Sequence, residues 1–211
     1  MDMRKRILAS VVGGALAAGL VFTVPSYTTC ARSDITSYRA KSPDAVSFHA
    51  GGPAEKIYNA YNFARRYNAI VVTTGTREQL TRQKEIAKEL NFPEENVIEL
   101  PIVRTTLDAA VEMKPVLEER GFREVTNVSS PNHLRTIKVL NDRLNGVNHT
   151  YEPLSSEYVG DRFQMIECVS EDVALRTSNI LGGYKSPLGK FVVNLYSFLA
   201  DHLRGVAQKA D

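Results

Sequence analysis

The chain has 211 residues, of which 43% are hydrophobic and 24% are charged, and its formal net charge is +2. This length and composition suit a globular domain with a substantial core and a short appendage. A charge so close to zero gives no reason to expect nucleic acid as a partner.

The N-terminus predicts export or membrane anchoring. Basic residues at positions 4–6 precede an uncharged, largely apolar run from Ile7 to Val24, which Pro25 follows. This order is typical of a secretory signal, and the run is also nearly long enough to span a membrane. Because basic flanks stay in the cytoplasm, the rest of the chain is expected outside it. We expect a signal peptide or transmembrane anchor over residues 1–26, whose cleavage stays open, and a polar linker over residues 27–43.

The chain has two cysteines, Cys30 in the expected linker and Cys168 in an expected strand. A disulfide between them is one alternative outside the cytosol. We favour an exposed thiol at Cys30 and a small buried side chain at Cys168. The sequence has no zinc-ligand spacing and no clustered carboxylates at predicted strand ends, so we expect no metal site.

From Asp44 onwards, short apolar runs alternate with helical patterns. The predicted strands are Ala45–Ala50, Ala69–Thr74, Asn96–Leu100, Glu124–Ser129, Val147–Tyr151 and Phe163–Val169. The predicted helices are Pro53–Tyr67, Glu78–Leu90, Thr105–Arg120, Pro131–Leu144, Ser170–Ile180 and Gly189–Val206. This alternation predicts a Rossmann-like three-layer α/β sandwich over residues 44–190, with a mostly parallel sheet. The amphipathic C-terminal helix over 191–211 is expected to pack on this domain or to trail from it.

Polar residues follow four of the predicted strands, at the edge where open α/β sheets bind ligands. In chain order they are His49, Gly51 and Gly52, then Thr74 and Gly75, then Arg104, Thr105 and Thr106, and finally Ser130, Asn132 and His133. Glycines let a ligand approach the backbone, and helix N-termini favour anions. We therefore expect a small anionic ligand here, with Arg104 pairing with its charge. Ordinary turns and helix caps explain several of these residues equally well.

His133 and Asp108 are the candidate acid–base residues. His133 is expected in the first turn of a helix, where the dipole favours a neutral imidazole that can donate or accept a hydrogen bond. Asp108 is expected in the first turn of another helix, where its negative charge is favoured. No nucleophile–base–orienter triad can be assembled from the sequence. It therefore leaves both an enzyme and a binding protein open.

Several of these stretches resemble, in order and spacing, motifs of the YdcF-like family, also called domain of unknown function 218. They are Gly51-Gly52, Thr74-Gly75, Glu78-Gln79, Thr105–Ala109 and Ser129–Thr136, of which the last is the most specific match. The resemblance covers about Asp44 to Lys190. This chain departs from the family pattern at Thr105, Asp108, Ala109, Asn132 and Thr136, where the family has Asn, Glu, Asn, Tyr and Arg.

The resemblance implies a Rossmann-like domain that is often tethered to the bacterial inner membrane and faces the periplasm, as in the SanA- and ElyC-like proteins. These proteins are associated with envelope integrity and with cell-wall or surface-polysaccharide processes. The family has no settled reaction or cofactor, although binding of S-adenosylmethionine has been attributed to a cytosolic relative.

We therefore expect an envelope protein that binds a nucleotide-like molecule or a phosphorylated cell-wall or polysaccharide intermediate. A hydrolase or transferase acting on such an intermediate is one alternative. A non-catalytic interaction protein with a degenerate pocket is the other.

Overall fold

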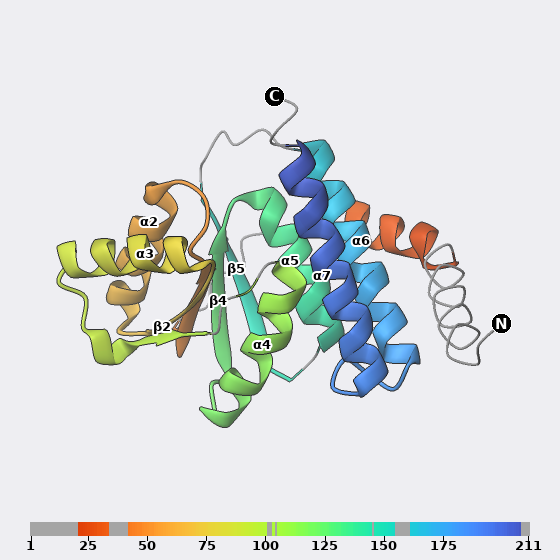
Figure 1. The fold of residues 1–211 in the computed structure, drawn as a ribbon. Helices are drawn as coiled ribbons and strands as arrows, with labels where there is room; N and C mark the ends of the chain where they lie inside the picture. The colour runs from red at the N-terminus through yellow and green to blue at the C-terminus, as the bar shows by residue number, and fades with distance from the viewer. Residues whose placement is uncertain are drawn as a thin grey trace.

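The computed structural model describes residues 21–33, 42–100, 103, 105–144, 146–154 and 161–207. A five-stranded sheet forms its centre (Figure 1), with strands in the order β3-β2-β1-β4-β5. The strands are β1 (Ala45–His49), β2 (Ile70–Thr74), β3 (Val97–Glu99), β4 (Glu124–Ser129) and β5 (Asn148–Pro153). All neighbouring strands are parallel, which confirms the predicted Rossmann-like α/β sheet. From β1 the chain adds β2 and then β3 on one side, and it then returns to add β4 and β5 on the other side of β1. The point between β1 and β4 is therefore the topological switch point, where open α/β sheets bind ligands.

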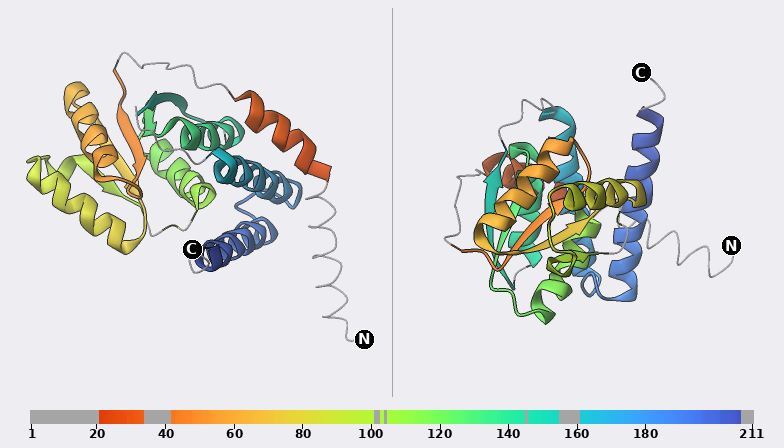
Figure 2. Two further views of the ribbon diagram at one scale, coloured as in Figure 1. Left: turned by 90° about the horizontal axis from the view of Figure 1, so that it is seen from above. Right: turned by 90° about the vertical axis from the view of Figure 1, so that its left-hand side faces the viewer.

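Helices cover both faces of the sheet (Figure 2). Two helices lie on one face, α2 (Ala54–Tyr67) and α3 (Arg77–Glu89). The other face carries α4 (Thr106–Glu119) and α5 (Pro131–Leu144), and α6 (Asp161–Ile180) and α7 (Pro187–Ala207) form an outer layer beyond them. A short 3-10 turn, η1 (Glu94–Asn96), precedes β3. The predicted three layers are thus extended by a fourth layer of helices.

Alternation along β1 decides which side chains face each layer. Val46 and Phe48 pack into the core against α2, whereas Ala45 packs with residues of α4. His49, four residues after Ala45, therefore faces the side of α4 and α5. Thr74 of β2 lies opposite His49 in the parallel register and shares that side.

The N-terminal part of the described chain corrects two expectations. Residues 21–32 are helical, so Pro25 does not end the helix and the first part of the expected linker is helix. Within this helix the hydroxyls of Thr28 and Thr29 donate hydrogen bonds to the carbonyls of Val24 and Pro25, one turn earlier. In the part of the chain that the structure describes, no helix is both long and apolar enough to cross a bilayer. Most of the predicted signal or anchor, residues 1–20, lies outside the described residues.

Cys30 and Cys168 form a disulfide, with their Cα atoms 6.2 Å apart, so the favoured prediction of two unpaired cysteines was wrong. Both residues are buried and pack against Val139 of α5. The predicted strand Phe163–Val169 was also wrong, because this segment belongs to α6. Periodicity does not distinguish a short apolar run in a strand from one in a buried helix.

His149 of β5 makes stability depend on pH. The pKa of His149 is lowered to about 4, mainly by burial; the charge of Asp142 opposes this shift and that of Lys114 adds to it. Its Nδ1 accepts a hydrogen bond from Asn127 Nδ2 at 3.2 Å, which suits the neutral ring. Below pH ~6.5 His149 is protonated in the unfolded state, whereas in the folded state it stays neutral down to about pH 4. The free energy of unfolding therefore falls as the pH falls through this range.

We expect the free energy of unfolding to be about 2–3 kcal/mol lower at pH 4.5 than at pH 7 on account of His149 alone. The His149→Gln variant should lose correspondingly less between the two pH values, because glutamine does not titrate. Urea unfolding of both proteins at both pH values measures the difference. Equal losses in the two proteins would contradict the role of His149.

Candidate functional site

Two histidine rings lie together at the switch point of the sheet. His49 ends β1, and His133 lies in the first turn of α5, directly after β4. Their ring centroids are 5.2 Å apart and the ring planes are tilted by 40°. Because β1 and β4 are neighbouring parallel strands, their carboxyl ends bring the two residues together. The sequence places His49 in the first of the four polar groups at the strand ends, but does not indicate an individual role for it.

The side chain of Thr106 links His133 to an acidic residue of α6. Thr106 Oγ1 lies 3.2 Å from His133 Nε2 and donates to Glu167 Oε1 at 3.3 Å. A hydroxyl has one proton and can accept through its lone pairs. When that proton goes to an ionised Glu167, the contact with His133 is a hydrogen bond only if His133 Nε2 carries a proton. The chain Glu167–Thr106–His133 therefore orients the ring and favours a proton on Nε2.

The start of α4 is occupied by acceptors from the protein itself. The backbone N–H of Thr106 donates to Oε1 of the buried Glu171 at 3.2 Å. Thr105 caps the helix by accepting from the N–H of Asp108 at 3.1 Å. The capping explanation thus accounts for Thr105, and the Thr106 hydroxyl is the part of this segment that reaches His133.

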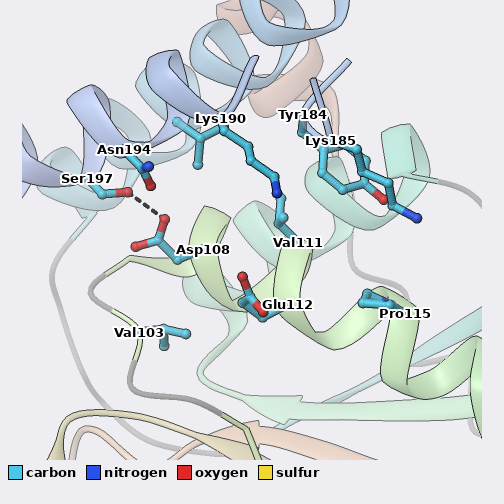
Figure 3. A pocket seen from close by; sticks show the side chains of 11 residues that line it. Val103, Asp108, Val111, Glu112, Pro115, Tyr184, Lys185, Lys190, Asn194 and Ser197 are labelled. Atoms are coloured by element: carbon cyan, nitrogen blue, oxygen red, sulfur yellow. Dashed lines mark hydrogen bonds between the residues drawn. The ribbon is translucent and has the colours of Figure 1, made fainter. Parts of the chain in front are cut away.

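Asp108 is held against α7. Its Oδ1 accepts a hydrogen bond from Ser197 Oγ at 2.6 Å. It lines a hollow of about 910 Å³ between α4 and α7, to which Glu112, Lys185 and Lys190 also contribute (Figure 3). Ser197 Oγ also lies 3.4 Å from Thr105 Oγ1, so α7 contacts the capped end of α4.

The side chain of Gln79 packs against two of the predicted site glycines, Gly51 and Gly75, at positions that a Cβ atom would block. A Cβ atom on Gly51 would lie 2.8 Å from Gln79 Nε2, and one on Gly75 would lie 2.9 Å from Gln79 Oε1. Gln79 is held there by a capping box, in which its Oε1 accepts from the N–H of Thr76 and its own N–H donates to Thr76 Oγ1. The glycines at the ends of β1 and β2 therefore make room for a side chain of the protein.

Of the other predicted ligand-binding residues, the structure describes Thr74 and Ser130 in full. Thr74 is fully buried on the side of His49, and its Oγ1 has no hydrogen-bond partner in the described part of the chain. Ser130 is half-buried at the start of α5 and accepts from the N–H of Leu134 through its carbonyl. Arg104 and the side chain of Asn132 lie outside what the structure describes.

Among the described residues, no group of three or more His, Cys, Asp or Glu side chains is arranged to hold a metal ion. The chain matches no known family model, no curated protein and no solved structure. Interpretation of the site therefore depends on its own residues.

Proposed function

We propose that this chain is a cell-envelope protein of the YdcF-like type whose domain lies outside the cytoplasm and binds a small anionic ligand. The ligand is a nucleotide-like molecule or a phosphorylated cell-wall or polysaccharide intermediate. The observation that carries the proposal is the meeting of His49, His133 and the Thr106 hydroxyl at the switch point of the sheet. This is the place where open α/β sheets bind ligands.

The chemistry of these residues suits a negatively charged group. Helix α5 begins beside the two rings, and the positive end of a helix dipole attracts anions. Glu167 and Thr106 orient the His133 ring, which can take up a second proton when an anionic ligand lies beside it.

The disulfide supports the location outside the cytoplasm. Disulfides form and persist in oxidising compartments and are rare in the cytosol of most organisms. The bond between Cys30 and Cys168 joins the α/β domain to the segment that directly follows the apolar N-terminal run. An exported domain, with residues 1–26 as signal or anchor, fits both features.

Acid–base catalysis on the same ligand is a second candidate function, which would make the protein a hydrolase or transferase. The chain Glu167–Thr106–His133 favours it, because a supported imidazole can take up and return a proton. In this version Glu167 supports the imidazole of His133, and Asp108 is not required as its partner.

His133→Ala should weaken binding of the soluble probe UDP-N-acetylglucosamine at least tenfold, because a hydrogen bond to a charged group is lost. The melting temperature should change little, since His133 is only half-buried. Isothermal titration calorimetry measures the affinity, and Lys138→Ala, which removes the partner of Asp142 on α5, is the control. Unchanged affinity in His133→Ala would remove its role. Absence of binding by the wild type, with farnesyl pyrophosphate also failing to bind, would favour a non-catalytic interaction protein.

A further inference from the structure

Helix α2 buries a lysine in its first turn. Lys56 is only 7% exposed, and lysine side chains are almost never buried so deeply without a partner. In the described part of the chain no carboxylate forms an ion pair with Lys56. Burial accordingly lowers the pKa of its ammonium group to about 8. A desolvated cation of this kind costs stability unless something compensates its charge.

The ammonium group of Lys56 lies against the turn that joins β1 to α2. Its Nζ is 3.7 Å from the position that a Cβ atom would take on Gly52. Gly52 has a φ of 94°, a conformation that residues other than glycine rarely adopt. From α3, Arg82 Nη1 donates to the carbonyl of Gly52 at 3.3 Å. Two cations from different helices therefore approach one turn at the carboxyl edge of the sheet.

The same turn leads into a helix that has no side-chain cap. The N-cap of α2 is Pro53, whose side chain cannot accept a hydrogen bond from the backbone N–H groups of the first turn. By contrast, the side chains of Thr76 and Thr105 accept such bonds at the starts of α3 and α4. The N-terminus of a helix carries partial positive charge, so a lysine in the first turn is opposed by the dipole as well as by desolvation. An anion bound at the turn would compensate both costs at once.

We propose that the turn at Gly52, together with Lys56 and Arg82, binds a phosphoryl group. The group is a phosphate monoester or diphosphate, the negatively charged end of the ligand. The inference rests on the proposed function, because it names the chemical class of the ligand and the residues that hold its charge. His49, two residues before Gly51, connects this turn to the histidine pair.

Inorganic pyrophosphate tests the phosphoryl site without the rest of the ligand. The full-length protein should bind it saturably in calorimetry. Lys56→Met should weaken this binding at least tenfold and Arg82→Gln by a smaller factor, while Lys56→Arg should retain part of it. Lys84→Met is the matched control, because Lys84 is an exposed lysine of α3 that pairs with Glu99. Lys56→Met should melt no lower than the wild type, since it removes an unpaired buried charge, so loss of binding will not reflect unfolding.

The outcomes separate this site from the proposed function. Pyrophosphate affinity within twofold of the wild type in Lys56→Met would overturn the phosphoryl site. If UDP-N-acetylglucosamine binding still fell in His133→Ala, the proposed function would stand without it. Loss of both ligands in Lys56→Met would support the site. UDP-N-acetylglucosamine and detergent-dispersed farnesyl pyrophosphate, compared on the wild type, would then distinguish a nucleotide source of the phosphoryl group from a lipid source.

Discussion

Asp172→Ala is expected to lower the free energy of unfolding by about 3–5 kcal/mol, the cost of breaking a buried ion pair from one side. The Asp172 side chain is fully buried on α6 and accepts hydrogen bonds from Arg143 of α5 and Arg176 of α6. Arg176 also donates to Thr29 Oγ1 at 3.4 Å. Loss of the carboxylate would therefore leave two partly buried guanidinium groups unpaired where three helical segments meet.

Urea unfolding of the two proteins measures this difference. Asp142→Ala is a suitable control, because the pair of Asp142 with Lys138 lies on the surface of α5 and exposed pairs of this spacing contribute only about 0.3–0.5 kcal/mol. A loss below about 1 kcal/mol in Asp172→Ala would show that water screens this cluster as it screens a surface pair.

Removal of the disulfide should be the second large effect, with a loss of about 2–4 kcal/mol. The bond joins residues 138 positions apart, and cross-links across long loops restrict the unfolded chain most. The double variant Cys30→Ala and Cys168→Ala can be compared with the wild type with and without dithiothreitol. Dithiothreitol should destabilise the wild type and leave the variant unchanged. Equal stability of the oxidised and reduced wild type would contradict the expectation.

The same variant should also bind ligand less well. Cys168 lies on α6 next to Glu167, and Glu167 and Glu171 both accept hydrogen bonds from Thr106. The disulfide therefore fixes the part of α6 that supports the site. Unchanged affinity for UDP-N-acetylglucosamine in the double variant would show that α5 and α7 hold α6 in place without it.

The α/β fold could be predicted because its signals are local. The run Ala69–Thr74 is rich in β-branched residues and is observed as a strand from Ile70 to Thr74. Strand β4 and helix α5 have the bounds that were predicted for them, Glu124–Ser129 and Pro131–Leu144. The strand predicted at Phe163–Val169 is instead part of helix α6. Its conformation depends on packing against α5 and on the disulfide to Cys30, and neither contact can be read from the sequence of the segment itself.

The site was predictable only where strand ends mark it. His133 and Thr106 follow strands that are not neighbours in the sheet, and they meet because α4 packs beside α5. Glu167 lies mid-helix and 61 residues from Thr106, so no spacing rule connects them. Lys56 has the sequence pattern of a solvated helical lysine, and its burial arises only when α2 packs on the sheet. Gln79 was noted for its family resemblance, but its contact with the glycines requires two strand ends to meet.

The disulfide also changes the topology of the polypeptide. Between Cys30 and Cys168 the backbone is closed into a covalent ring that contains all five strands of the sheet. A first proteolytic nick inside this ring opens it without releasing a fragment, whereas a nick in the turn between α6 and α7 separates the last helix covalently from the rest. As long as the disulfide is intact, the five strands survive such a nick as one covalent molecule.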